Sequence, residues 1–356
     1  VDGVTSAIQT QLDGKQDALT AGSGITISSG GTISASSSGG ASSLDDLSDV
    51  KIENSSYFIG STPSSTNNAA YNVGLGTNTL KSITTGDRNT AIGMEVLETA
   101  TIAEQNTSVG NQSMRYNTEG DRNSAFGSEA LLDNTTGSLN TALGYQALKS
   151  NTTADNNTAV GRQALSTNTT GTDNTAVGSL SLKDNTTGFG NSSLGRSTLT
   201  DNTTGRYNVA IGQESLFKNI TGHNNTAVGI SALPTAESAN NNVAVGGFTL
   251  YNTTGGGNTA LGYYAGDVLT SGTNNVILGY DSEVSASGAT NQIVIGKGAT
   301  GQGDNYAVIG NADVTRVYAA QDAGATLYAG GLNIGGTALT STAAELNYVV
   351  GVTSAI

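Results

Sequence analysis

The sequence predicts an all-β fold: a parallel β-solenoid (β-roll) of about 15 rungs with 17-residue repeats, homotrimeric, with short coiled-coil helices at both ends. Three observations predict it. A pentapeptide recurs with a fixed period, and residues of the same kind occupy the same places within each repeat. Apolar residues follow a helical spacing near both ends. The repeat comes first because it covers most of the chain.

The pentapeptide Asn-Thr-Ala-Val-Gly sets the period. Close variants place an Asn at a strict 17-residue period from Asn72 to Asn242; the next step, to Asn258, is shorter by one, and the last weak copy ends at Gly310. The exact copies are Asn157–Gly161, Asn174–Gly178 and Asn225–Gly229. A period this short and strict indicates one unit stacked on itself, with rungs at the strand spacing of ~4.8 Å and a rod of ~70 Å over residues 72–310.

Columns of like residues define the unit. A large apolar residue precedes each closing Gly, another comes four residues after it, and a small residue such as Ala159 lies just before the first. We interpret each unit as two short strands joined by turns, one of them Asn-Thr-Thr-Gly, with both large apolar columns inside the coil and the small column permitting close approach between chains. The residues expected to carry the repeat are Asn89, Gly93, Leu97, Asn123, Gly127, Asn157, Gly161, Leu165, Asn174, Gly178, Asn225 and Gly229.

Composition excludes several classes of protein. The 356 residues contain 49 Gly but only 2 Pro and no Gly-X-Y period, so the chain is not collagen-like. The net charge of −14 gives an acidic rod no general attraction for nucleic acid. Cysteine is absent, which excludes disulfides and thiolate metal sites, and no apolar run approaches the ~20 residues of a membrane-spanning helix. We expect neither nucleic-acid binding nor membrane insertion.

The two ends carry helical apolar stripes, predicted over residues 1–16 and 341–356. The second begins with a capping box in which Glu345 follows Thr342 by three residues. Either stripe is too short for a stable isolated helix, so we expect a coiled coil between identical chains. The predicted trimerisation residues are Val4, Ile8, Leu12, Leu346, Val349, Val352 and Ile356.

Three connecting segments complete the chain. Residues 17–43 contain a short strand around Ile25 and Ile27 and a Ser/Gly linker, and residues 311–340 form a short β connector that includes strands at Val314–Ala320, Ala325–Ala329 and Leu332–Ile334. Residues 44–71 are a connector or cap, with Tyr57–Gly60 as an entry rung. Three carboxylates crowd the stretch 44–50, but it lacks the Gly and distal Glu of a calcium loop, so we expect a solvated or capping role and no metal.

The ends of the chain resemble each other. Residues 349–356 match residues 1–8 at seven of eight positions. The second helix stops in mid-pattern where the first continues into Leu12, which predicts a module of about 348 residues that continues into a next module of the same fibre.

The repeat Asn-Thr-Ala-Val-Gly-x-x-Ala-Leu-x-x-Asn-Thr-Thr-Gly resembles the shaft repeats of phage long tail fibres, especially those of marine and cyanobacterial phages. The stretches 342–348, 4–15 and 44–50 are also similar to segments of such fibres. The repeat further resembles the head β-roll of trimeric autotransporter adhesins, whose repeats are shorter by about three residues. Both resemblances imply a homotrimer.

The predicted function is therefore structural. We expect a shaft segment of a phage tail fibre, located in the virion, that positions a host-receptor-binding tip; the alternative is an adhesin on a bacterial cell surface whose solenoid itself binds a host glycan or protein. The single histidine, His223, lies at a turn position of a repeat, where a surface residue is expected, and the chain has no Cys to partner it. Acidic residues such as Asp121, Asp155, Asp173 and Asp184 are scattered, and no pair stands out as a glycosidase pair. We expect no enzyme activity and no cofactor.

Overall fold

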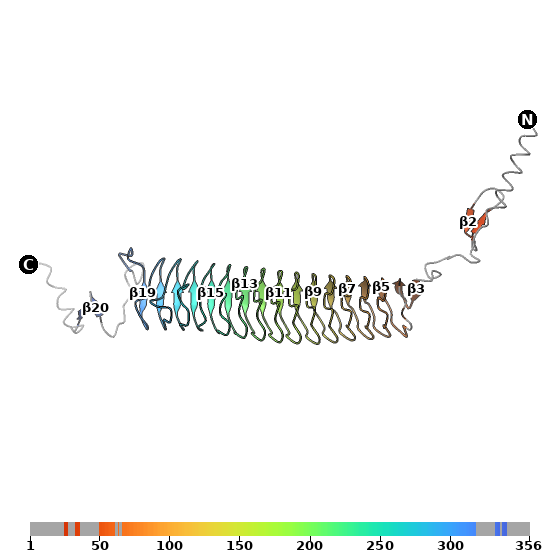
Figure 1. The fold of residues 1–356 in the computed structure, drawn as a ribbon, viewed down its shortest axis with the longest axis horizontal. Coiled ribbons are helices and arrows are strands. Elements are labelled where there is room, and N and C mark those ends of the chain that lie inside the picture. The colour runs from red at the N-terminus through yellow and green to blue at the C-terminus, as the bar shows by residue number, and fades with distance from the viewer. Residues whose placement is uncertain are drawn as a thin grey trace, which may run out of the picture. The chain divides into compact units, whose positions relative to one another are not determined.

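The computed structural model describes residues 50–60, 63 and 66–317, together with the backbones of four short strands outside them. The strands β5 to β19 stack in parallel along one axis, one strand in each coil of the chain (Figure 1). Their starting residues follow the 17-residue period, except that the step to β16 is shorter by one and the step to β19 is shorter by three. This confirms the parallel β-solenoid with one repeat in each coil.

Each strand of the solenoid has three residues and pairs in register with the next. The strands are β5 (Val73–Leu75), β6 (Thr90–Ile92), β7 (Thr107–Val109), β8 (Ser124–Phe126), β9 (Thr141–Leu143), β10 (Thr158–Val160), β11 (Thr175–Val177), β12 (Ser192–Leu194), β13 (Val209–Ile211), β14 (Thr226–Val228), β15 (Val243–Val245), β16 (Thr259–Leu261), β17 (Val276–Leu278), β18 (Ile293–Ile295) and β19 (Ala307–Ile309). The register places like residues opposite each other, as in the pairing of Ala159 with Ala176.

A hairpin covers the first coil. Strands β3 (Val50–Glu53) and β4 (Ser56–Ile59) pair antiparallel, and β4 pairs in parallel with β5. Phe58 is fully buried, and the hydroxyl of Ser56 accepts a hydrogen bond from the backbone N–H of Asn72 at 3.0 Å. The hairpin therefore occupies one otherwise unpaired edge of the sheet and supplies its first inward side chains.

Two further hairpins lie outside the solenoid: β1 (Ile25–Ile27) with β2 (Ile33–Ala35), and β20 (Leu332–Ile334) with β21 (Thr337–Leu339), both antiparallel. Residues from 312 onward form a separate unit. The strand expected from Val314 does not exist over residues 314–317, and the strand at Thr337–Leu339 was not expected. The predicted helices at 1–16 and 341–356, with all seven predicted trimerisation residues, lie outside the described residues, as does the strand predicted at 325–329.

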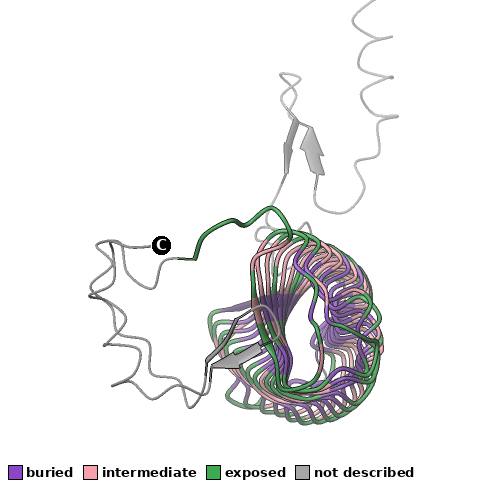
Figure 2. Cartoon of the chain, turned by 90° about the vertical axis from the view of Figure 1, so that its left-hand side faces the viewer, coloured by how far each residue is buried: buried purple, intermediate pink, exposed green. Residues whose placement is uncertain are grey.

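The interior of each coil is thin and lined mainly by small residues. Viewed along the rod, successive coils superpose as one outline (Figure 2). In the coil that begins at Asn140 the fully buried or nearly buried residues are Asn140, Ala142, Ala147, Leu148, Asn151 and Ala154. The Leu column that follows the closing Gly is therefore inside, as expected, and so is the small Ala column, which was expected to face other chains.

The large apolar column that precedes the closing Gly points outward, and the prediction that it lies inside the coil was wrong. Leu143 is 47% exposed, whereas its strand neighbour Ala142 is fully buried. Alternate residues of a strand point to opposite faces. Because Asn140 and Ala142 point inward, Thr141 and Leu143 must point outward.

Each unit has one strand and not two, which is a second correction. On the far side of the coil two residues per unit adopt left-handed backbone angles, for example Gln146 (φ 56°) and Leu148 (φ 51°). These angles are incompatible with an extended strand. The backbone still bonds from coil to coil there, as from Leu148 N–H to Ala164 C=O at 3.0 Å. The stacking is therefore continuous although the second side is not a strand.

The closing glycines turn the chain after each strand, and we call them the corner glycines. Gly161 has φ 133°, and a Cβ at this position would lie 2.5 Å from the carbonyl oxygen of Gly178 in the next coil. The other corner glycines predicted as repeat residues, Gly93, Gly127, Gly178 and Gly229, have φ between 131° and 141°. Glycine is thus required both by the backbone angle and by the close approach of the next coil.

The first Asn column is a buried ladder that closes each coil and joins it to the next. Asn157 donates from Nδ2 to the carbonyl oxygen of Gly171 in its own coil at 2.9 Å, and its Oδ1 accepts the backbone N–H of Asn174 at 3.0 Å. The same bonds recur from Asn72 to Asn275, so the predicted repeat residues Asn89, Asn123, Asn157, Asn174 and Asn225 all belong to this ladder. Fully satisfied buried amides stabilise one register of stacking and no other.

A second, shorter Asn ladder lines the turn. It runs from Asn117 to Asn219, with each Nδ2 donating to the Oδ1 of the preceding coil, as from Asn151 to Asn134 at 2.8 Å. Ala236 occupies the place of the next Asn. As a result the Oδ1 of Asn219 is buried without a hydrogen-bond partner.

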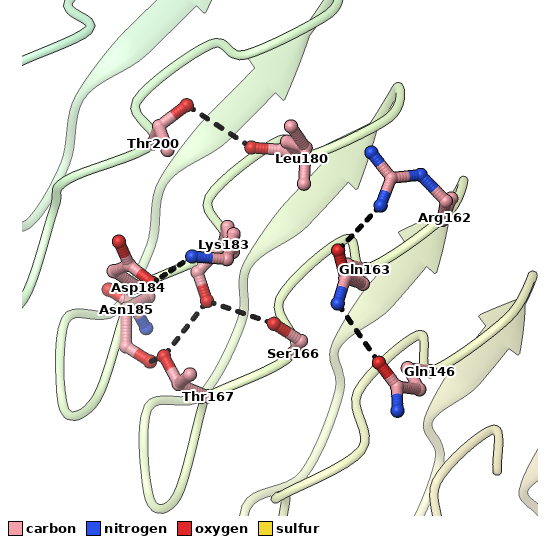
Figure 3. Close-up of polar contacts among 10 residues, drawn as sticks. All are labelled: Gln146, Arg162, Gln163, Ser166, Thr167, Leu180, Lys183, Asp184, Asn185 and Thr200. Atoms are coloured by element: carbon pink, nitrogen blue, oxygen red, sulfur yellow. Dashed lines mark hydrogen bonds and ion pairs between the residues drawn. The ribbon is translucent and has the colours of Figure 1, made fainter.

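Polar side chains outside the core also bond between coils (Figure 3). Gln163 donates from Nε2 to the Oε1 of Gln146 at 2.9 Å, and Thr167 donates to the carbonyl oxygen of Lys183 at 2.8 Å. Ion pairs follow the same direction, as between Lys149 and Glu129 at 2.7 Å. These half-exposed contacts add to the coil-to-coil stacking, although each contributes little by itself.

Candidate functional site: an uncharged outer face of the sheet

A continuous apolar row runs along the outer face of the parallel sheet. We call it the outer stripe; it has one residue in every coil, and the eight most exposed members are 36% to 58% exposed. Its members are Leu75, Ile92, Val109, Phe126, Leu143, Val160, Val177, Leu194, Ile211, Val228, Val245, Leu261, Leu278, Ile295 and Ile309. At the spacing of neighbouring strands the row is about 70 Å long.

No charged residue lies on the outward positions of strands β5 to β19. The second outward position of each strand carries a Thr, Ser, Val, Ile or Ala, for example Thr141, Thr158 and Val243. The ion pairs lie elsewhere on the coil, as in the pairing of Arg115 with Glu95 and Glu98 at 3.0 and 2.7 Å. In a chain with net charge −14, an uncharged face of this length differs sharply from the remaining surface.

A second feature is an aromatic cluster at the C-terminal coils, formed by Phe248, Tyr251, Tyr263, Tyr264 and Tyr280. Tyr263 is the centre: its ring centroid lies 4.5 Å from that of Tyr264, 5.8 Å from that of Phe248 and 6.1 Å from that of Tyr280. The rings of Tyr263 and Tyr280 are nearly parallel, with an interplanar angle of 8°. The pKa of Tyr264 is raised, first by its hydrogen bond to Tyr263 and then by the charges of neighbouring groups.

An acidic pair lies beside this cluster. The carboxylate of Glu283 accepts the backbone N–H groups of Asp267 and Val268 at 3.1 and 3.3 Å. Burial, followed by the hydrogen bond and the charge of the Asp267 side chain, raises the pKa of Glu283 to about 8. The pair therefore holds a proton at neutral pH.

The other candidate catalytic residues have structural partners. Asp121 and Asp155 each accept a backbone N–H from the preceding coil, from Glu104 at 2.8 Å and Ser138 at 2.7 Å. His223 accepts the backbone N–H of Arg206 through Nδ1 at 3.3 Å. Asp184 pairs with Lys183 at 3.0 Å, and Asp173 is exposed. Within the described residues, no group of three or more His, Cys, Asp or Glu side chains is placed to hold a metal ion.

Sequence reasoning missed both surfaces. It placed the outer stripe inside the coil, and it named no aromatic cluster. A signal for the cluster exists, because Tyr263 and Tyr280 are separated by one full 17-residue period and therefore occupy the same place in adjacent coils. Phe248 and Tyr264 are related in the same way across the coil that is shorter by one residue, and they also stack, with ring centroids at 5.2 Å.

Comparison with known proteins adds no assignment: no protein-family model matches the chain, and no curated protein matches its sequence. In the described part of the chain no helix is long and apolar enough to cross a membrane. The solenoid and its two surface features are therefore the basis for any statement about function.

Proposed function

We propose that this chain is a structural fibre protein, a shaft segment that assembles as a homotrimer through the outer stripe and positions a host-receptor-binding tip, as in a phage tail fibre. The observation that carries the proposal is the outer stripe itself. It is half exposed in a single chain, yet it is apolar in every one of the coils from β5 to β19. The coil's own packing does not require this, because the side chains point away from the core.

Comparison between the repeats strengthens the argument. The position directly after the corner glycine is also on the surface, and it varies freely: it is Met94, Asn111, Ser128, Tyr145 and Arg162 in successive coils. The outer stripe accepts only Leu, Ile, Val and Phe. An exposed position that stays apolar while its neighbour varies indicates contact with another surface.

The size of the stripe fits a stable interface. Taking about half of a buried Leu or Val side chain per residue gives about 50 Å² each and roughly 700 Å² per chain. Specific interfaces bury ~800 Å² per partner, and monomers rarely expose a contiguous apolar patch above a few hundred Å². A second copy of the chain is the natural occupant, since an identical rod has the same length, the same coil spacing and a complementary uncharged face.

Three copies fit the two outward positions of each strand. In a parallel trimer with a threefold axis, one outward column of each chain contacts the other outward column of its neighbour, and the ring of contacts closes. The helical stripes predicted at both ends and the resemblance to phage fibre shafts and autotransporter heads support the same stoichiometry. The rod acts as scaffold and not as catalyst in this proposal, with adjacent modules of the same fibre as its further partners.

Light scattering of the full chain in native buffer tests the stoichiometry. We expect three times the chain mass of 35.6 kDa. The double variant Leu143→Lys/Leu194→Lys places like charges along the shared axis and should lower this mass while the β-sheet circular dichroism is kept. The control Thr153→Lys/Thr204→Lys adds the same charges at the same separation on exposed turns. A folded wild-type monomer, or equal masses for the two variants, would overturn the proposal.

The tail-fibre assignment needs a separate test, because a β-rod also suits a cell-surface adhesin. The complete reading frame around this segment distinguishes them. A virion-attachment region or fibre chaperone domain supports a tail fibre, and a C-terminal membrane anchor supports the adhesin and contradicts location in a virion.

A further inference from the structure

The aromatic cluster belongs to the turns that follow the corner glycines and not to the strands that carry the outer stripe. Tyr263 and Tyr280 follow the corner glycines Gly262 and Gly279, and Tyr264 is one residue further on; all belong to the turn and not to the strand.

The cluster is the one place among the described residues where aromatic rings from more than two coils meet. Tyr251, Tyr263 and Tyr280 are 39%, 43% and 53% exposed. The core does not need these rings, because the buried columns continue beneath them with Ala260, Ala265 and Ile277.

The rings are held in place before any ligand arrives. Tyr263 packs edge-on against Tyr264 at 79° and against Phe248 at 83°. It also leans over Gly247, where a Cβ would come within 3.1 Å of two of its ring carbons. Rings fixed in this way lose little conformational freedom on binding, which favours affinity.

Hydrogen-bonding groups border the rings. Asp267 and Glu283 form the acidic pair described above, and Asp267 is close enough to influence Tyr264. The exposed amide of Asn252 donates to the carbonyl oxygen of Asp267 at 2.7 Å, which leaves the Asn252 Oδ1 directed elsewhere. Flat exposed rings bordered by carboxyl, amide and phenol groups suit a ligand with apolar C–H faces and hydroxyl edges.

We propose that this cluster is a carbohydrate-binding site in which a neutral glycan packs its C–H faces on the exposed rings of Tyr251, Tyr263 and Tyr280. The nearly parallel rings of Tyr263 and Tyr280, with centroids 6.1 Å apart, offer the glycan an apolar surface, while its hydroxyl groups bond to Asp267, Glu283 and Asn252. This inference is independent of the oligomeric state.

Calorimetric titration of the full chain with cellohexaose and chitohexaose tests the site. We expect binding of at least one probe, and a loss of about tenfold or more in affinity for Tyr263→Ala/Tyr280→Ala. Tyr145→Ala is the matched control, since Tyr145 has the same place in its coil and is 47% exposed but lies outside the aromatic cluster. It should bind as the wild type does.

Several outcomes would overturn the site: no binding of either probe, unchanged affinity of the double variant, or equal loss in the control. Light scattering on the same variants separates this proposal from the previous one. If Tyr263→Ala/Tyr280→Ala lowers the assembly mass, the cluster is part of the interface between chains and not a glycan site. A wild-type monomer that binds the glycan would refute the trimer and leave the site intact.

Discussion

Replacing Asn157 by alanine removes one member of the first Asn ladder and tests whether the ladder determines the stability of the stack. Its Nδ2 bonds to Gly171 C=O at 2.9 Å, and its Oδ1 accepts the N–H of Asn174 at 3.0 Å. The carbonyl of Gly171 keeps a second donor, Asn168 Nδ2, at 2.9 Å. The N–H of Asn174 has no other acceptor among the described residues, so the variant leaves one buried donor unpaired.

The expected destabilisation follows from these bonds. An unpaired buried donor costs about 1–3 kcal/mol, and the lost Nδ2 bond adds about 1 kcal/mol. We therefore expect Asn157→Ala to lower the free energy of unfolding by about 3 kcal/mol. Asn111→Ala removes the same atoms from an exposed side chain and should change stability by less than about 0.5 kcal/mol.

Guanidinium unfolding followed by circular dichroism measures the difference between the two variants. Hydrogen exchange locates it: the amide of Asn174 should lose protection first, because contacts in a solenoid are between neighbouring coils. Equal unfolding midpoints for Asn157→Ala and Asn111→Ala would refute the ladder as a source of stability. Loss of protection spread evenly over the rod would refute its local action.

Three further changes test other parts of the fold. Ala236→Asn should raise the free energy of unfolding by about 1 kcal/mol, measured by guanidinium unfolding, since its Nδ2 gives the orphaned Oδ1 of Asn219 a donor; a lower midpoint contradicts this. Gly161→Ala should lower the free energy of unfolding by more than about 2 kcal/mol, measured by thermal unfolding. Gly161 has φ 133°, and an alanine Cβ there would clash with the carbonyl oxygen of Gly178; an unchanged melting temperature would contradict this. Glu283 keeps its proton in the folded state up to about pH 8 but ionises near 4.5 when unfolded, so the stability of the wild type should fall as the pH rises between these values. The urea unfolding midpoint of Glu283→Gln should not show this fall with pH. Midpoints of the wild type and the variant that change in parallel with pH would contradict the prediction.

The sequence was sufficient to predict the solenoid because periodicity is a property of the chain. Because Asn recurs every 17 residues, each coil of 17 residues places the same residue type at the same inward position. Stacking the coils brings these like residues into contact. The phase of the strand is a different matter. Side chains of a strand alternate between its two faces, so a shift of one residue decides whether Ala142 or Leu143 points inward. Hydrophobicity alone favoured Leu143 as the inward residue, and this choice was wrong. The buried Asn140, which makes the hydrogen bonds, determines the phase.

The residue types at the left-handed positions also indicate their backbone angle. The inner Leu column contains Leu and Met but no β-branched residue at Leu80, Leu97, Met114, Leu131 and Leu148. At φ near 50° a β-branched side chain would clash with the backbone. The absence of β-branched residues from this column therefore indicates the left-handed backbone angle. The outer stripe, in extended backbone, accepts Val and Ile freely. The choice between Leu and Val in two equally apolar columns therefore distinguishes a turn from a strand.

The repeats of this chain serve as their own comparison set, and they separate two kinds of surface. Where a position is buried, as at Asn157 and Leu165, uniformity follows from packing and needs no partner. Where a position is exposed and still apolar in every coil, as along the outer stripe, our proposal assigns the constraint to an identical rod alongside, which would act on every coil. A feature that occurs once, as the rings of Tyr263 and Tyr280 do, cannot serve a contact repeated along the rod. It fits a ligand recognised at one place, so the uniform face and the singular cluster point to assembly and recognition as separate tasks of one scaffold.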